Sequence, residues 1–297
     1  MKIHADCVPC LMRRVLFQSR LDGRSDDYAS VEAGLKAFAA NISPDKTTVE
    51  VATAVHAACY ARLSTEDPYR KIKANADIVA DRLVPCAQAY VDASEDRMDA
   101  VLLVSAVGNI MDFGSAAQAI DDPEEFEPIF DRLVSEGLGL YDKEVISSLI
   151  MGARSILFFF DNCGESQLDR ILIRELRKKG KKVTGVVRGK SILGDVTAED
   201  AERSGLAMDL DKLLDTGKFF VGVDWGSMPE GLVSEVLVSD LIIMKGMANY
   251  ESVSDIQIPI PIIHILRAKC IPVADSIGVP QGTNAVFAVL NGRRMGE

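Results

Sequence analysis

The sequence predicts an α/β protein in which a helical N-terminal region, residues 1–94, precedes a three-layer α/β/α sandwich with a mainly parallel sheet, residues 95–297. Two observations predict this class. Apolar residues in the first 90 positions recur at helical spacing, and no strand-like run competes with them. From residue 155 onward, short apolar runs alternate with helical patterns, which is the rhythm of βαβ units and a parallel sheet. The polar stretch 92–99 lies between the two parts.

The elements before residue 155 are predicted to be mostly helical. The apolar stripe on the first helix consists of Val8, Leu11, Met12, Val15 and Leu16. Asp67-Pro68 predicts another helix start, because a capping residue followed by Pro is typical of a helix N-terminus. The apolar segment 99–114 follows, and its pattern does not decide between helix and strand. Further helices are predicted at about 122–135 and 142–152.

Four apolar runs are predicted strands, and each ends in polar residues. They are 155–160, ending at Asp161 and Asn162; 183–187, ending at Arg188; 219–223, ending at Asp224; and 241–244, ending at Lys245. The carboxyl ends of neighbouring parallel strands share one sheet edge, where open α/β folds bind ligands. Any strand must end in something polar, so each position alone is weak evidence. Together, these carboxylates, amide and cations suggest a metal-assisted phosphoryl site.

The composition argues against some classes of partner. The net charge is −11 and Lys and Arg form no basic stripe, which argues against nucleic-acid binding. Charged residues interrupt the first 20 positions and no apolar run approaches membrane-spanning length, so we expect a soluble, cytoplasmic protein without a membrane partner. Six cysteines are too few for a disulfide scaffold. The pattern leaves the oligomeric state open.

Asp161, Asn162 and Asp195 are the predicted metal ligands. All three offer oxygen, which favours a harder divalent cation such as Mg²⁺ or Mn²⁺ over a thiolate-held zinc. Two carboxylates leave coordination positions for water and a substrate phosphate. The alternative is that Asp161 and Asp195 cap helices and hold no metal, and spacing alone does not exclude it. Glu165 begins the next helix, where it either complements the helix dipole or orients a water. Asp161 and Glu165 are therefore the candidate catalytic residues.

The substrate phosphate is predicted to bind near two cations. Lys245 would act as a point charge and Arg188 through its planar fork, although ordinary ion pairs are the simpler interpretation of both. The turn after Lys245 lets backbone N–H groups approach an anion, and Asn249 adds a side-chain donor. Asn109, at the end of the buried segment 99–114, and Ser227, in the loop after the third predicted strand, complete the candidate set.

A Cys-x-x-Cys pair near the start is a separate motif. Cys7 and Cys10 could form a redox pair or half of a second metal site, with His4 as a further ligand. No second Cys-x-x-Cys exists, and on a helix both cysteines would lie on one face beside Leu11, so plain burial is the commonest outcome. His264, in an apolar run, is predicted to be a core histidine.

These motifs together resemble the DUF89 (ARMT1-like) family of metal-dependent phosphatases, in particular its stand-alone prokaryotic branch with an N-terminal cysteine pair. The motifs are Asp6-x-x-x-Cys10 with Cys7, Gly108-Asn109 with Asp112-Phe113-Gly114, Asp161-Asn-Cys-Gly-Glu165, Arg188-Gly with Asp195, and Lys245-Gly-x-x-Asn249. The resemblance covers nearly the whole chain. It implies a divalent metal (Mn, Ni, Co or Mg) at Asp161, Asn162 and Asp195, with phosphate near Lys245. It also implies hydrolysis of small phosphorylated metabolites, such as sugar phosphates or damaged and side-product phosphometabolites.

Two functional hypotheses follow. The first is a metal-dependent phosphatase with water as the nucleophile; an aspartyl-phosphate route through Asp161 is the alternative mechanism, although the second acid that such enzymes carry two residues on is here Cys163. The second is a non-catalytic metal or redox sensor whose working site is the cysteine pair. A dinucleotide-binding enzyme fits worse, because the loop after residue 160 lacks the Gly-x-Gly-x-x-Gly pattern.

Overall fold

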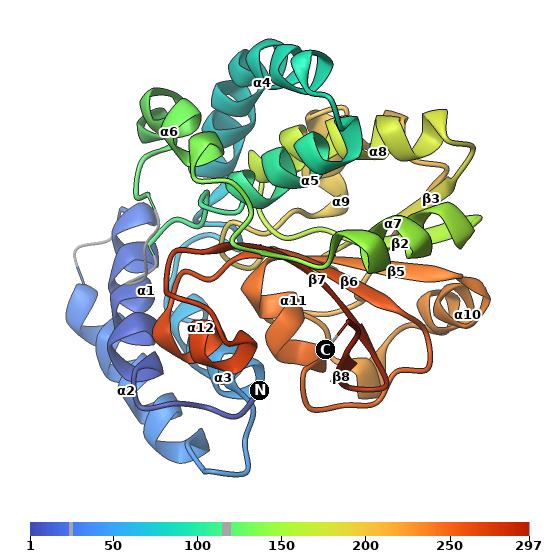
Figure 1. The fold of residues 1–297 in the computed structure, drawn as a ribbon. Helices are drawn as coiled ribbons and strands as arrows, with labels where there is room; N and C mark the ends of the chain where they lie inside the picture. The colour runs from blue at the N-terminus through green and yellow to red at the C-terminus, as the bar shows by residue number, and fades with distance from the viewer. Residues whose placement is uncertain (24–25, 115–119, 297) are drawn as a thin grey trace.

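The computed structural model of the chain describes residues 1–23, 26–114 and 120–296. Among these residues, eight strands form one sheet in the order β1-β7-β6-β5-β2-β3-β4, with β8 paired to β7. Helices pack against the sheet, and the first three helices lie together beside one end of it (Figure 1). The prediction of an α/β fold with a mainly parallel sheet is confirmed.

The four strands at the centre of the sheet are parallel. β2 (Ser155–Phe159) lies between β3 (Lys182–Val187) and β5 (Leu241–Lys245), and β6 (Ile262–Arg267) pairs with β5. The carboxyl ends of these strands therefore share one edge of the sheet, the edge at which open α/β folds place their ligands. Three of the four predicted strands correspond to β2, β3 and β5.

The outer strands complete the sheet. β4 (Lys212–Asp215) runs parallel to β3, and β7 (Asn284–Leu290) runs antiparallel to β6. β1 (Leu140–Tyr141) and β8 (Arg293–Arg294) are short strands that both pair with β7. The antiparallel pairs are therefore β6 with β7 and β7 with β8, whereas β1 pairs with β7 in parallel.

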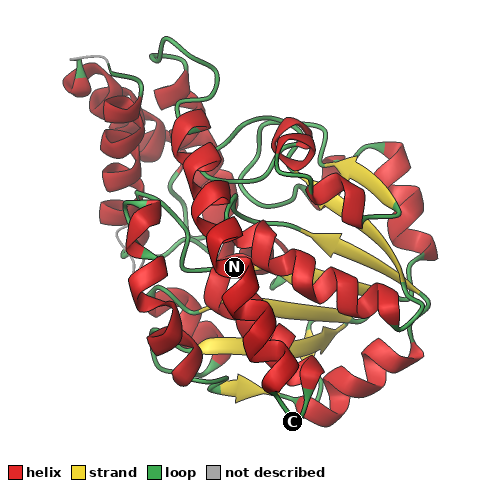
Figure 2. Cartoon of the chain, turned by 90° about the horizontal axis from the view of Figure 1, so that it is seen from above, coloured by secondary structure: helices red, strands yellow, loops and turns green. Residues whose placement is uncertain are grey.

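The sheet is buried on both faces. Ile156 and Phe158 of β2 belong to one apolar cluster, whereas Leu157 and Phe159 belong to another, because successive side chains of a strand point to opposite faces. The amphipathic α8 (Glu165–Lys178) joins the first cluster, and α10 (Glu230–Val238) joins the second. Helices are consequently seen on both sides of the strands (Figure 2).

The N-terminal part is helical, as predicted. Its helices are α1 (Cys7–Leu21), α2 (Asp27–Asn41), α3 (Thr48–Tyr60), α4 (Arg70–Ala93) and α5 (Arg97–Gly108). The segment 99–114, which the sequence left undecided, is thus mostly helix α5. α4 and α5 pack against α8, whereas α1, α2 and α3 pack on one another. One apolar cluster runs through both parts of the chain, and the division at residue 94 stays a prediction.

The remaining α-helices connect the strands. They are α6 (Phe130–Ser135), α7 (Lys143–Gly152), α9 (Ala198–Arg203), α11 (Gly246–Val253) and α12 (Ile271–Ile277). The predicted helix at 122–135 is instead two 3₁₀ turns, Pro123–Glu125 and Glu127–Ile129, followed by α6. None of the described helices is long and apolar enough to cross a membrane.

The predicted strand at 219–223 is wrong, because this segment is a loop. Helical side chains satisfy its backbone: Val221 N–H donates to Thr53 Oγ1 and Val223 N–H to Ser252 Oγ, both at 2.9 Å. Gly222 between them has φ +70°, and a Cβ there would lie 2.1 Å from Ser252 Oγ. The strand that follows β3 in the chain is instead the less apolar β4, which forms one edge of the sheet.

His264 in β6 is a core histidine, and we expect it to make the protein sensitive to acid. Its side chain is 1% exposed, and burial lowers its pKa from 6.5 to about 3. Below pH 6.5 the unfolded chain binds a proton at this position that the native state does not bind. The stability contribution of neutral His264 is therefore complete above pH 6.5 and is lost as the pH falls toward 3.

Between pH 7 and pH 5, the titration of this histidine lowers the unfolding free energy by about 2 kcal/mol. The variant His264→Phe should lose correspondingly less unfolding free energy over that interval, because its ring packs in the same place against Tyr250 and Phe287 without titrating. Urea unfolding at the two pH values measures this. An equal loss in both proteins would contradict the assignment.

Candidate functional site

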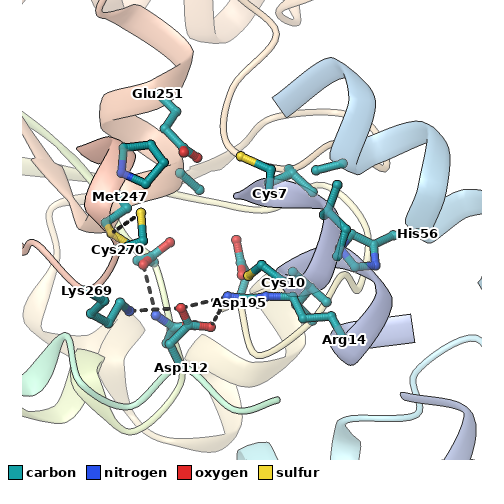
Figure 3. A pocket seen from close by; sticks show the side chains of 18 of the residues that line it. Cys7, Cys10, Arg14, His56, Asp112, Asp195, Met247, Glu251, Lys269 and Cys270 are labelled. Atoms are coloured by element: carbon teal, nitrogen blue, oxygen red, sulfur yellow. Dashed lines mark hydrogen bonds and ion pairs between the residues drawn. The ribbon is translucent and has the colours of Figure 1, made fainter. Parts of the chain in front are cut away.

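A cavity opens at the carboxyl edge of the parallel strands, where the first helices meet the sheet (Figure 3). Its lining comes from α1 and the residues before it, from α3, from loops after the strands, and from the region of α11 and α12. The lining residues are Asp6, Cys7, Cys10, Leu11, Arg14, Ala52, His56, Asp112, Asp161, Asn162, Leu193, Asp195, Val221, Met247, Ala248, Glu251, Lys269, Cys270 and Pro272. All three predicted metal ligands are among them.

Two loops hold these three side chains together. Asp161 and Asn162 follow β2, and Asp195 lies in the loop that follows β3. The loops are joined by an antiparallel bridge between Asn162 and Asp195, with Cys163 N–H donating to Gly194 O and Val196 N–H to Asp161 O, each at 2.8 Å. The backbone thus fixes the proximity that sequence spacing could only suggest.

Asp161 is enclosed by donors on both oxygens. Asn109 Nδ2 and Asn162 Nδ2 donate to Asp161 Oδ2 at 3.1 and 2.9 Å, and Arg188 Nη2 lies 3.5 Å from Oδ1. Gly246, the first residue of α11, passes so close that a Cβ would lie 1.9 Å from Asp161 Oδ2. The position of this carboxylate is therefore set by amides, a guanidinium and a glycine together.

Arg188 and Asn249 lie behind the predicted ligands and do not line the cavity. Arg188 is 1% exposed; its Nε donates to Asp195 Oδ2 at 2.5 Å and its Nη1 to Asn249 Oδ1 at 2.9 Å. Asn249 Nδ2 in turn donates to the carbonyl oxygens of Phe160 and Lys245. In this arrangement Arg188 orients Asp195, and its predicted contact with phosphate stays a prediction.

Lys245 and Glu165 form a buried ion pair that, like Arg188 and Asn249, lies behind the cavity wall. Lys245 Nζ donates to Glu165 Oε1 and to Ser105 O at 2.7 Å each, and it lies 2.9 Å from Asp169 Oδ1. All three N–H bonds of the ammonium thus have protein partners, and the side chain is fully buried. Glu165 also accepts hydrogen bonds from the side chains of Asn109 and Asn162. The structure therefore surrounds Glu165 with donors, and neither residue lines the cavity.

The carboxylates of this site favour a cation. Burial, and next the charges of Asp195 and Glu165, raise the pKa of Asp161 well above its usual range. Burial also raises the pKa of Asp195, although Arg188 opposes the shift. A divalent ion would relieve this repulsion, and its oxygen donors would be Asp161, Asn162 and Asp195. Among the described residues, no group of three or more His, Cys, Asp or Glu side chains is placed so that it could hold a metal ion, and the metal site at Asp161, Asn162 and Asp195 stays a prediction.

Two cations on the cavity wall were missed by the sequence reasoning. Arg14 Nη2 donates to both oxygens of Asp112 at 2.7 and 2.8 Å, and Lys269 Nζ lies 2.9 Å from Asp112 Oδ2 (Figure 3). Burial acts against ionisation of Asp112, but Arg14 and Lys269 outweigh it and lower the pKa of Asp112 to about 2. The sequence contains a signal for Lys269: it lies two residues after the end of the apolar strand β6, much as Lys245 is the last residue of β5. Arg14 shares the helix face of Cys7 and Cys10.

The other predicted residues are divided between the cavity and the surface. Cys7 and Cys10 line the cavity and form no disulfide. Burial raises the pKa of Cys7 to about 11, so its thiol is protonated at neutral pH and is a weak nucleophile and metal ligand. His4 is an exposed neighbour of Asp6 outside the lining. Ser227 is exposed and also lies outside it, because its segment is not a strand end.

Comparison with known proteins gives a consistent result. Residues 3–285 match the model of the damage-control phosphatase ARMT1-like domain. The chain is 38% identical to a damage-control phosphatase of Archaeoglobus fulgidus over 95% of this chain and 97% of that protein. It is 26% identical to a damage-control phosphatase of Pyrococcus horikoshii over 95% of this chain and 96% of that protein. A crystal structure of a DUF89 family protein from Pyrococcus horikoshii has the same fold, with a TM-score of 0.83, 23% identity and coverage of 99% and 100%.

Proposed function

The chain belongs to the damage-control phosphatase ARMT1-like family, and from this premise we propose that it is a divalent-metal-dependent phosphatase of small phosphorylated metabolites. The convergence of Asp161, Asn162 and Asp195 on one cavity wall is the observation that carries the proposal. Oxygen donors of this kind suit Mg²⁺ or Mn²⁺, and Co²⁺ and Ni²⁺ are further candidates.

A cation held by these three residues would supply polarisation of a phosphoryl oxygen and activation of a water. The protein's own contribution is positioning. Asn109 and Gly246 fix the carboxylate of Asp161, and Arg188 fixes that of Asp195. Such fixed geometry is effective because reacting groups must be aligned before the reaction step.

The phosphate would meet two cations of the cavity wall. Arg14 offers a planar guanidinium and Lys269 a point charge, and both are already aligned by Asp112. Lys245 and Arg188 would contribute at longer range, since their donors are engaged with Glu165 and Asp195. Together these groups would stabilise the negative charge of the transferring phosphoryl group.

Water is the proposed nucleophile. Phosphatases that form an aspartyl-phosphate use a second acid two residues after the nucleophile, and here that residue is Cys163. Cys163 is 1% exposed, and burial raises the pKa of its thiol well above the usual range, so it does not serve as an acid. Net retention of configuration at phosphorus, measured with a phosphate ester made chiral by oxygen isotopes, would indicate two successive displacements and contradict water as the direct nucleophile.

The test is hydrolysis of an aryl phosphate with Mn²⁺, Mg²⁺, Co²⁺ or Ni²⁺ and with a chelator. We expect turnover that the chelator abolishes, and a loss of about a thousandfold in Asp161→Ala if the metal lowers the barrier by ~4 kcal/mol. Asp131→Ala, which removes an exposed acid on α6, is the matched control. Metal-independent turnover, or none across a broad panel of phosphoesters, would count against the proposal.

The alternative of a non-catalytic metal or redox sensor is tested by the same assay. The double variant Cys7→Ala, Cys10→Ala removes both thiols from the cavity wall. If the sensor hypothesis is right, the double variant loses its bound metal while the natural chain shows no phosphatase activity. Undiminished metal content and undiminished phosphatase activity in the double variant would contradict the sensor hypothesis.

A further inference from the structure

The cavity has two chemically different ends. At one end, oxygen and nitrogen groups gather around Asp195 and Asp112, with Arg14 and Lys269 beside them (Figure 3). At the other end lies the carboxyl group of Glu251. Sulfur atoms separate the two, since the thiols of Cys7 and Cys270 and the thioether of Met247 lie between them; Cys270 Sγ is 4.0 Å from Met247 Sδ. A ligand with phosphate at the first end would therefore bring its organic part toward Glu251.

Glu251 contributes a carboxyl group to the cavity wall. The residue lies on α11 one turn after Met247, so both side chains are on the face of the helix that lines the cavity. No donor among the residues that the structure describes forms a hydrogen bond with its side chain, whereas its backbone oxygen accepts one from the Met1 ammonium at 2.7 Å. The side chain is half-buried, and burial raises its pKa to about 7. The carboxyl group is only partly buried and faces the cavity, so a ligand that enters the cavity can replace water as its hydrogen-bond partner.

We propose that Glu251 is a specificity-determining residue that accepts hydrogen bonds from hydroxyl groups in the organic part of the substrate. The preferred substrates are then phosphate monoesters of uncharged polyols, and phosphorylated carboxylic acids are disfavoured. This inference rests on the proposed phosphatase function. An ionised carboxylate accepts hydrogen bonds from hydroxyls and repels a second carboxylate, and both effects are stronger in a partly buried site than in water.

A hydroxyl fits this end better than an ammonium group. Three positive charges already act on Glu251. The Met1 ammonium, then Arg14 and Lys269, lower its pKa against the dominant effect of burial, whereas Asp112 raises it. A cationic substrate would add a further positive charge, whereas a hydroxyl would satisfy the carboxyl group without one. Asp6 also lines the cavity, but its carboxylate is exposed and its field is screened by solvent.

The test compares two substrates of the same carbon skeleton, glycerol 3-phosphate and 3-phosphoglycerate, which differ in a hydroxymethyl group against a carboxylate. The full chain is assayed at pH 8.5, above the pKa of Glu251, with the metal that best supports aryl phosphate hydrolysis. We expect kcat/KM to favour glycerol 3-phosphate by about tenfold or more. In Glu251→Gln this ratio should fall by about tenfold, because the amide no longer repels the carboxylate. Asp6→Asn, which removes the exposed acid of the same cavity, should keep the ratio of the natural chain.

Several outcomes would overturn the inference: an unchanged ratio in Glu251→Gln, an equal change in Asp6→Asn, or a natural preference for 3-phosphoglycerate. So would a preference for glucosamine 6-phosphate over glucose 6-phosphate that Glu251→Gln abolishes. A second readout is the rise in melting temperature on adding each three-carbon compound. If no phosphoester is hydrolysed but Glu251→Gln still alters the relative shifts, the phosphatase proposal fails while the binding role of Glu251 stands. If the natural chain hydrolyses phosphoesters but Glu251→Gln changes neither the kcat/KM ratio nor the melting-temperature shifts, only the role of Glu251 fails.

Discussion

Replacing Gly246 with Ala is expected to lower phosphatase activity by at least about a hundredfold, since displacing a reacting group by about 1 Å has an effect of that size. The Cβ of alanine would lie 1.9 Å from Asp161 Oδ2 and 2.4 Å from Asp161 Cγ, so the carboxylate must move. Gly246 also has φ +75°, a conformation that costs an L-residue about 1–2 kcal/mol. Steady-state kinetics with an aryl phosphate and saturating metal measures the effect.

Gly278→Ala separates backbone strain from the clash. Gly278 follows α12 with φ +72°, and a Cβ there would meet nothing within 4 Å. This variant should lose a similar 1–2 kcal/mol of unfolding free energy while it keeps its activity. If Gly246→Ala is as active as Gly278→Ala, then the close approach to Asp161 has no role in catalysis.

Replacing Lys245 with Met is expected to destabilise the fold by about 3–5 kcal/mol, the usual cost of removing one partner of a buried ion pair. Lys245 is fully buried between Glu165 and Asp169, and Ser105 Oγ donates to Asp169 Oδ1 at 2.6 Å. Burial raises the pKa of Asp169 to about 7 even though Lys245 opposes the shift. Without the ammonium, two acids remain in a site that cannot solvate their charges.

The pH dependence of this variant has a defined sign. Loss of Lys245 raises the pKa of Asp169 further above its unfolded value, so the native state binds more protons than the unfolded state. The variant should therefore be least destabilised near pH 6 and more so at pH 8, as measured by urea unfolding. Lys36→Met, which breaks an exposed pair with Glu32, is the control and should resemble the natural chain at both pH values. Equal destabilisation of both variants would refute the role of the buried pair.

The sequence predicted the parallel strands of the site because their signals are local. The run 155–160 is apolar on both faces and ends at Asp161, as a buried strand between two helical layers requires. The capping box of Thr197 and Asp200 at the start of α9 is a local feature of the same kind, since both partners lie within four residues. The local signal was misleading at 219–223. This run has the composition of a strand, but its backbone donors are satisfied by the side chains of Thr53 and Ser252, which are distant in the sequence.

The candidate site was only partly predictable. Asp161 and Asn162 were singled out because they follow the end of a predicted strand, and Asp195 was added as a third oxygen donor. The structure brings all three to one cavity wall. Arg14 and Asp112, by contrast, acquire their place in the cavity through a contact between residues 98 positions apart. No local pattern records such a contact: Asp112 was named only as part of a family motif, and Arg14 was not given a role in the site.

By itself the sequence determined the α/β class, the strands β2, β3 and β5, and the polar residues that follow them, because periodicity and strand-end chemistry act over a few residues. Only the tertiary structure decided which charges face the cavity and which lie behind it. Lys245 and Arg188 are enclosed by partners, whereas Lys269 and Glu251 reach the cavity. The physical reason is that burial and ion pairing depend on distant segments, and in this chain the same residue types serve as buried counter-ions at one position and as ligand-facing groups at another.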